Sequence, residues 1–190
     1  MNRSFLSLCS CGFLFTVLFV HPSCLNGVQP IVITVGVSTD VDMATGGLFG
    51  GTPATTDLRG ALNQVNINPQ FQGYVINFSP GLGPIHLGAL LPVLNLVQSY
   101  PLAINGNASS PVIIDGGNTY RGLLAHQGTV FLSNLQIQNT IARGGNGGAG
   151  SGLGGGGGMG AGAALFVNSA SVILSNVSMN NSVAIGGNGG

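Results

Sequence analysis

Two stretches of the chain, GTVFLSNLQIQNTIARGGNGG (Gly128–Gly148) and ASVILSNVSMNNSVAIGGNGG (Ala170–Gly190), align without a gap at an offset of 42 residues. Eleven of the 21 aligned positions are identical, and both copies end in GGNGG. Self-similarity at a fixed spacing is typical of repeat architectures, in which each unit buries its hydrophobic face against its neighbour. The sequence therefore predicts that the two copies stack on each other.

Apolar and polar residues alternate within each copy, as they do in β-strands, where successive side chains point to opposite faces. Asn134 and Asn176 interrupt the alternation at the same place, and asparagine tolerates the left-handed conformation of a sharp corner. Each copy is therefore expected to form three short strands, 122–127, 129–134 and 135–139 in the first copy. The residues predicted to form the structural core are Val130, Leu132, Leu135 and Ile137, with their repeat mates Val172, Leu174, Val177 and Met179.

Short strands, tight corners and a repeat together favour an all-β fold, a parallel β-helix with coils about 4.8 Å apart. The tract from Gly144 to Gly162 holds 13 glycines in 19 residues. It restarts at the same place in the second copy, so we interpret it as a loop leaving a coil corner and not as an interdomain linker. No helical pattern follows it, which argues against a dinucleotide-binding turn.

A short helix is expected before the strands. Leu58, Ala61, Leu62 and Val65 have the helical spacing i, i+3, i+4 and i+7, and Thr56 is a candidate N-cap. Such a helix would cover the open end of the stack, where a sheet edge and core side chains are otherwise exposed.

Composition limits the class of partner. Only 4% of the 190 residues are charged, the net charge is zero, and the four arginines are scattered. Nucleic-acid binding is not expected, because contacts to phosphates need clustered cations. The 44% of apolar residues are sufficient for a buried core.

The N-terminus has the pattern of a secretory signal peptide, predicted at residues 1–24. Arg3 precedes 16 uncharged residues, 5–20, a stretch that is short for a membrane span. A retained anchor and lipidation at Cys24 are the alternatives. Residues 28–55 form an N-terminal segment of uncertain structure, and residues 56–190 form the predicted β-helical domain, which we expect to be incomplete at its C-terminus.

The stretches DLRGALNQVN, INFSPGLGPIHL, VIIDG and LSNLQIQN resemble the passenger domains of bacterial autotransporters, and the glycine-punctuated repeats resemble chlamydial polymorphic outer-membrane proteins. The resemblance covers residues 56–190. It implies a right-handed parallel β-helix that is exported and displayed at the cell surface, where it has an adhesin-like role. A C-terminal membrane β-barrel, which such proteins carry, would be the means of association with the outer membrane.

Residues with catalytic potential are few, and we expect no catalytic, cofactor-binding or metal-binding site. Asp115 lies in IDGG and is interpreted as a turn residue, while Asp40 and Asp42 are interpreted as solvated loop acids. The other polar residues weighed as bases or as contacts for an anionic glycan are His86, His126, Arg121 and Arg143. Each is interpreted as a solvent-facing side chain.

The sequence therefore predicts a non-enzymatic, secreted or surface-exposed segment with a structural and binding role. The expected partner is a host-cell receptor or glycan, and self-association is a further option. Phe131 and Ile173 occupy the same outward repeat position and are the candidate binding face. The alternative is a truncated polysaccharide lyase or glycoside hydrolase, for which Asp115 would be the acidic residue.

Overall fold

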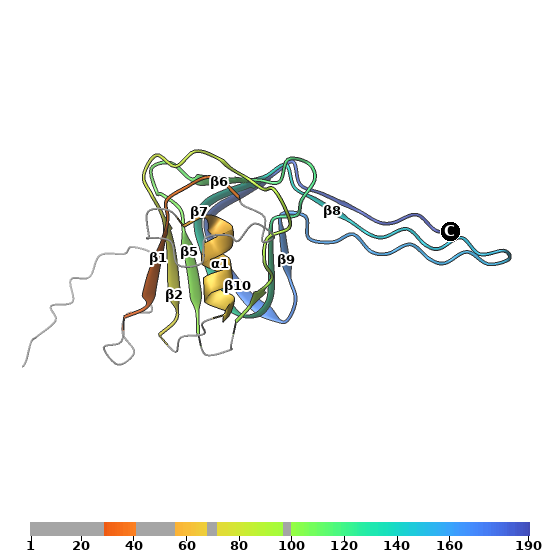
Figure 1. Cartoon of the computed structure of the whole chain (residues 1–190), viewed down its shortest axis with the longest axis horizontal. Coiled ribbons are helices and arrows are strands. Elements are labelled where there is room, and N and C mark those ends of the chain that lie inside the picture. The colour runs from red at the N-terminus through yellow and green to blue at the C-terminus, as the bar shows by residue number, and fades with distance from the viewer. Residues whose placement is uncertain (1–28, 41–55, 68–71, 97–99) are drawn as a thin grey trace, which may run out of the picture.

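The computed structural model describes residues 29–40, 56–67, 72–96 and 100–190 (Figure 1). The predicted signal peptide, residues 1–24, lies outside the described residues, and so do residues 41–55 with Asp42. Within the N-terminal segment of uncertain structure, Ile31–Val35 form the first strand, β1.

Most of the described strands belong to one nine-stranded sheet, in which neighbouring strands pair in parallel. Its main path runs through β1, β2 (Tyr74–Phe78), β5 (Leu102–Asn105), β7 (Leu123–Gln138), β6 (Val112–Asp115) and β3 (Ile85–His86). Three more strands pair with β7: β4 (Leu94–Asn95), β9 (Leu165–Val167) and β10 (Ala170–Asn180). A separate two-stranded sheet joins β8 (Ile141–Arg143) to β11 (Val183–Ile185).

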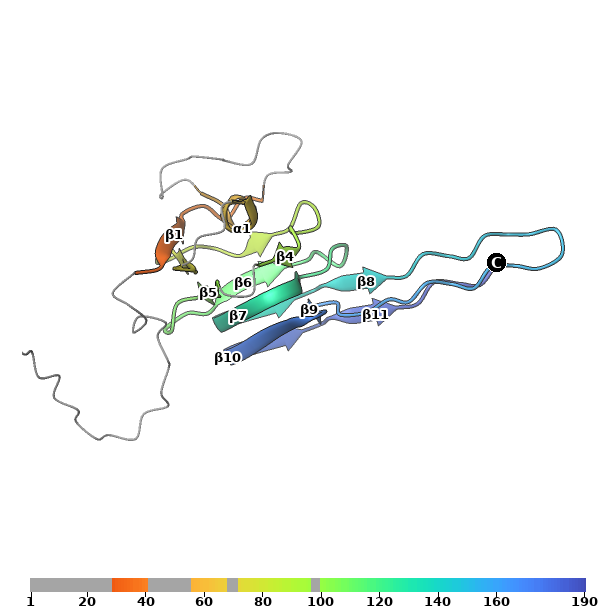
Figure 2. The same cartoon turned by 90° about the horizontal axis from the view of Figure 1, so that it is seen from below.

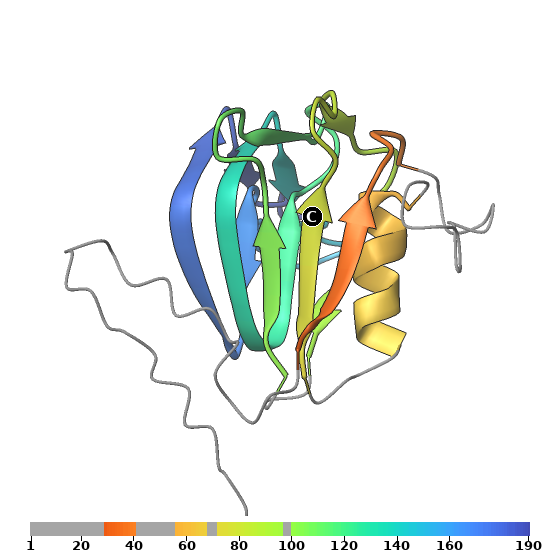
Figure 3. The same ribbon diagram turned by 90° about the vertical axis from the view of Figure 1, so that its left-hand side faces the viewer.

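The helix predicted from the apolar spacing is α1, Leu58–Ile67. Asp57 Oδ1 accepts the N–H of Gly60 at 2.6 Å, and the carbonyl of Asp57 accepts the N–H of Ala61 at 3.1 Å. Asp57 is therefore the N-cap in place of the expected Thr56. The helix lies beside β1 and also contacts β4 (Figure 3).

The two repeat copies lie side by side in register. β10 pairs in parallel with β7 so that Ala170 faces Gly128 and Asn180 faces Gln138, an offset of 42 residues throughout. The same offset relates β9 to the start of β7 and β11 to β8. The alignment read from the sequence is thus the pairing of the strands, because equivalent side chains pack best on each other.

One hydrophobic core joins the strands and the helix. It contains Leu62 of α1, Ile76 of β2, Ile104 of β5 and Leu132 of β7, each exposed by 1% or less. At about 25 cal/mol for each Å² of apolar surface removed from water, such side chains supply the main driving force for folding.

The expected all-β, right-handed parallel β-helix with an end-capping helix is wrong. The structure is a mostly parallel β-sheet with one short helix, an α/β-like arrangement, and seven of the ten helical residues are buried. Alternation and repetition predict parallel neighbouring strands, but they do not specify how the strands close around a core. The helix is part of that core, since Leu58, Ala61, Leu62 and Val65 pack in the same cluster as the strands.

The division of each copy into three short strands is also wrong. Residues 123–138 form the single strand β7, and 170–180 form the single strand β10. Asn134 and Asn176 lie inside these strands with φ of 52° and 51°, the left-handed conformation expected at a corner. The bend occurs without ending the strand, because the residues on both sides keep pairing with the neighbouring strand.

Candidate functional site

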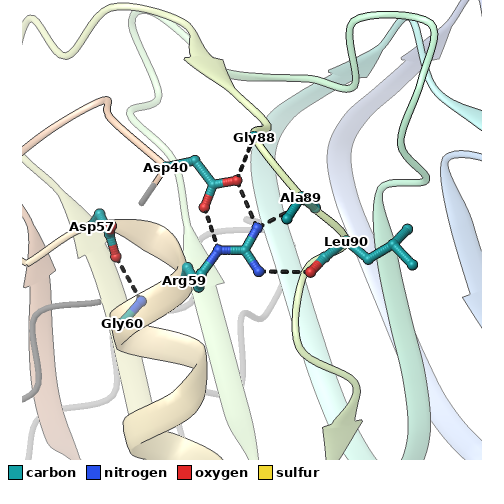
Figure 4. Close-up of polar contacts among 7 residues, drawn as sticks. All are labelled: Asp40, Asp57, Arg59, Gly60, Gly88, Ala89 and Leu90. Atoms are coloured by element: carbon teal, nitrogen blue, oxygen red, sulfur yellow. Dashed lines mark hydrogen bonds and ion pairs between the residues drawn. The ribbon is translucent and has the colours of Figure 1, made fainter. Parts of the chain in front are cut away.

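Arg59 of α1 is buried and makes most of the polar contacts drawn in Figure 4. Its Nε and Nη2 donate to Asp40 Oδ1 and Oδ2 at 2.6 and 2.7 Å, a two-point contact. Nη1 donates to the carbonyl of Leu90 at 2.6 Å and Nη2 to that of Ala89 at 3.0 Å. The side chains of Arg59 and Asp40 are only 2% and 1% exposed.

This cluster ties three parts of the chain together. Asp40 follows β1, Arg59 belongs to α1, and the N–H of Gly88, which follows β3, donates to Asp40 Oδ2 at 2.7 Å. Among the described residues, every buried side-chain nitrogen and oxygen has a hydrogen-bond partner. The ion pair is therefore a structural contact whose donors and acceptors are already used within the protein.

Sequence reasoning missed this pair. Asp40 was expected to be a solvated loop acid, and the structure corrects this, since its carboxylate is buried against Arg59. Arg59 was not singled out, because the helical spacing was read only from apolar residues. One signal in the sequence pointed to the pair. The chain has only four arginines and four acids, and Arg59 lies within the short predicted helix beside the apolar Leu58.

A hollow of about 390 Å³ lies beside this cluster, at the carboxyl ends of the parallel strands β1 and β2. Residues 36–39 and 79–83 line it, with the hydroxyl-bearing Ser38, Thr39 and Ser79 and with no charged side chain. The carboxyl end of a parallel sheet is a common place for ligands in α/β folds. The hollow is wide open to solvent, and hydroxyl, peptide and apolar groups line it.

Asp115, at the end of β6, lies in a second polar cluster. Its Oδ1 accepts the N–H of Gly117 at 2.9 Å, and its Oδ2 accepts Gln138 Nε2 and Asn139 Nδ2, each at 2.9 Å. Burial alone raises the pKa of Asp115, but these hydrogen bonds and the nearby His86 outweigh it, so the pKa is lowered. The carboxylate therefore stays ionised as an acceptor that holds the turn, as the sequence predicts.

The predicted core residues of the two copies differ in exposure. Val130, Leu132, Leu135 and Ile137 of β7 are buried, at 1% exposure or less. In β10, which pairs only with β7 among the described strands, Val172 and Val177 are half-buried while Leu174 and Met179 are 46% and 39% exposed. The exposure follows from position, since β7 has neighbours on both sides.

The candidate binding-face residues Phe131 and Ile173 are direct register partners on β7 and β10. Phe131 is half-buried and Ile173 is 44% exposed. His86 is exposed and is the register partner of Asp115, while the exposed His126 contacts Asn168 Nδ2 at 3.0 Å. The remaining candidates, Arg121 and Arg143, lie apart from these: Arg121 sits over the ring of Phe166 at 5.9 Å, and Arg143 is exposed.

Residues 144–162 and 186–190, named here the glycine arm, project from the rest of the described residues, the sheet body (Figures 1 and 2). The arm consists of three extended segments joined by backbone hydrogen bonds of 2.7–2.9 Å. The donors recur at every third residue, and the bonds run from Gly144 to Ile185, Gly147 to Asn188, Gly155 to Gly148, Gly158 to Gly145, Gly187 to Gly158 and Gly190 to Gly155.

Close packing in the arm has the same spacing of three. A Cβ added at Gly147, Gly157 or Gly190 would overlap a backbone oxygen of a neighbouring segment. A Cβ at Gly145, Gly152 or Gly156 would meet nothing within 4 Å. Three residues per turn without internal hydrogen bonds is the geometry of polyproline II chains. The tract expected to be a loop is therefore an ordered backbone bundle in the structure.

The remaining observations concern membranes, metals and relatives. In the described part of the chain, no helix is long and apolar enough to cross a membrane. The same residues contain no group of three or more side chains suited to hold a metal ion. Comparisons with models of protein families, with curated proteins and with solved structures find no match to this chain.

Proposed function

We propose that this chain is an exported, surface-displayed, adhesin-like segment with a structural and binding role, as the resemblance to autotransporter passenger domains implies. The observation that supports the proposal is the glycine arm. It extends away from the sheet body and is held by hydrogen bonds between three backbone segments (Figure 2). A rigid projection of this kind suits the presentation of a contact surface at a distance from the cell.

The arm offers a neutral surface to a partner. Residues 144–190 contain no Asp, Glu, Lys, Arg or His. Leu153, at the turn that joins the first two segments of the arm, is 92% exposed, and Met159, near the base of the arm, is 80% exposed. Single exposed apolar side chains are common on protein surfaces, so the arm offers a partner a neutral backbone surface and not an apolar patch. The chemistry favours a neutral glycan or an uncharged protein surface over a phosphate-rich partner.

Export rests on the uncharged stretch 5–20 and is part of the same proposal. Mass spectrometry of the native protein, taken from the outer-membrane and the secreted fractions, tests it. A mature N-terminus near residue 25 in either fraction supports export. Recovery of the unprocessed chain from the cytoplasm alone contradicts it.

Binding is tested with the fluorescently labelled full chain on epithelial cells and on an array of neutral oligosaccharides. Gly157→Ala disturbs the arm, because its new Cβ overlaps the carbonyl of Gly187, whereas the matched Gly156→Ala adds the same methyl group in open space. The proposal expects binding by the wild type and by Gly156→Ala, and loss of at least about tenfold in Gly157→Ala. Equal binding by both variants, or no binding by the wild type, contradicts it.

A further inference from the structure

Polar side chains cross four neighbouring strands on the outer face of the sheet body. The register pairs His86 of β3 with Asp115 of β6. It also pairs Asp115 with Gln138 of β7, and Gln138 with Asn180 of β10. Gln136 lies two residues before Gln138 and therefore points to the same face. These five residues are named here the polar row. The residues that precede its members on β3, β6 and β7 are 0% exposed and point to the core: Ile85, Ile114 and Ile137.

The carboxylate of Asp115 holds the amides of the polar row in place. Gln138 Nε2 and Asn139 Nδ2 each donate to Asp115 Oδ2 at 2.9 Å. Gln136 Nε2 donates in turn to Gln138 Oε1 at 2.6 Å. Asp115 is 7% exposed and its pKa is lowered, so it is an ionised acceptor at neutral pH. The amides are thus ordered before a ligand arrives, which reduces the entropy cost of binding one.

Other hydrogen-bonding groups of the polar row are unused. Within the described part of the chain, the His86 and Asn180 side chains and Gln136 Oε1 have no hydrogen-bond partner. His86 and Asn180 are exposed, and Gln136 is half-buried. Amide and imidazole groups both donate and accept hydrogen bonds, as the hydroxyl groups of a sugar do. Asp115 is the only carboxylate of the row, and the row contains no arginine, so its charge disfavours an anionic ligand.

The spacing of the polar row indicates the shape of the ligand. Neighbouring strands lie about 4.8 Å apart, which is close to the length of one pyranose unit in an extended glycan. A linear oligosaccharide laid across the four strands would therefore place about one sugar unit over each strand. A further strand paired with β10 would lengthen the row and would leave its outer face open.

We infer that the polar row binds a linear neutral oligosaccharide that runs across β3, β6, β7 and β10. His86, Gln136 and Asn180 supply the free hydrogen-bonding groups, and Asp115 is the positioning residue. The inference goes beyond the proposed function, because the polar row belongs to the sheet body and not to the glycine arm.

NMR titration of the isotope-labelled full chain tests the inference, with cellotetraose, xylotetraose and laminaritetraose as probes. A few hydrogen bonds on an open face give weak binding, with a Kd of about 1 mM, so binding is measured at equilibrium in solution. At least one probe should shift the amide signals of the polar row and leave those of the glycine arm unchanged. The corresponding disaccharide reaches fewer strands and should bind several-fold more weakly.

Matched double variants locate the binding on the polar row. His86→Ala/Gln136→Ala removes two contact groups and should raise the Kd by at least about tenfold. His126→Ala/Gln127→Ala removes the same two residue types, also one exposed and one half-buried, at the start of β7 and should bind like the wild type. Gly157→Ala should also bind like the wild type, so a failure of the arm proposal would leave this result unchanged.

Asn180→Ala gives a second reading at an exposed residue of β10 and should weaken binding by about threefold. Circular dichroism of each variant confirms that it is folded. The inference would be overturned if none of the three probes shifted the polar row, or if tetragalacturonate bound more tightly than the neutral probes. Equal losses in the two double variants, or unchanged binding by Asn180→Ala and the polar-row double variant, would also overturn it.

Discussion

The sheet body and the glycine arm are held together in opposite ways. In the sheet body, side chains such as Ile76, Ile104 and Leu132 fill the space between backbone elements. In the arm, backbone packs directly on backbone, and at Gly147 or Gly157 even a methyl group would overlap a neighbouring carbonyl. The difference teaches that a segment without an apolar core can still be ordered, provided that its backbone groups bond to each other at a regular spacing.

The largest expected effect is the unfolding of the sheet body by a charge in one repeat copy, while the same charge at the equivalent position of the other copy is tolerated. Leu132→Asp buries a carboxylate at a residue 1% exposed and should cost about 5 kcal/mol or more, enough to unfold a typical domain. Leu174→Asp changes the same repeat position, but at 46% exposure, and the sheet should survive. Circular dichroism measures both. Loss of the β-sheet signal in both variants, which the sequence pattern alone would predict, contradicts the burial difference.

Arg59→Met gives the next largest effect, because it leaves the carboxylate of Asp40 buried without its counter-charge. The free energy of unfolding should fall by about 3–5 kcal/mol in urea titrations. Removing both charges, in Arg59→Met/Asp40→Leu, should recover part of the loss. The exposed Arg143→Met is the control and should change the stability by less than about 0.5 kcal/mol. A loss no larger in Arg59→Met than in this control would contradict the ion-pair account.

Gly157→Ala sharpens the comparison because it acts on the arm alone. The overlap of the new methyl group should destabilise the arm by about 1–3 kcal/mol. This loss should appear as faster hydrogen exchange in residues 144–160 and 186–190. The melting temperature of the sheet body should stay the same, since none of its core residues is touched. Gly156→Ala, with open space around the new Cβ, should exchange like the wild type. Equal exchange in the two variants would refute close packing at Gly157.

The smallest effect is the pH dependence from Asp115. Its pKa in the folded protein lies below the ordinary 3.8, so its contribution to stability is complete above that pH and is lost as the pH falls through the folded pKa. Urea titrations between pH 5 and 2 should therefore show a shallower acid loss in Asp115→Asn than in the wild type. Identical acid profiles of the two proteins would show that the folded structure does not lower this pKa.

The sequence allowed the local pairings to be predicted, but not the fold class. The aligned copies gave the register of β7 and β10 because stacked strands repeat the same side-chain environment. The apolar spacing predicted the position of α1 in the chain. It did not predict that α1 packs in the core or that Arg59 forms an ion pair, because the contacts of Arg59 join residues 19 to 31 positions apart. Such distant contacts leave no periodic signal in the chain.

The order of the arm went unpredicted for a different reason. Glycine has no side chain, so it carries no hydrophobic pattern, and a glycine-rich tract is usually flexible. The only trace was the spacing of three in GGNGG, which puts Gly144 and Gly147 in one segment and Gly187 and Gly190 in another. The exposure of Leu174 was also beyond the sequence pattern, since identical leucines differ here only in having a neighbouring strand on both sides.

Amide hydrogen exchange of the wild-type arm, followed residue by residue by NMR, tests the central claim most directly. The account predicts slow exchange at the donors Gly144, Gly147, Gly155, Gly158, Gly187 and Gly190, and fast exchange at Gly152 near the tip. Protection would then recur at every third residue within each segment. Uniformly fast exchange across residues 144–162 would contradict the account and would make the arm a flexible loop.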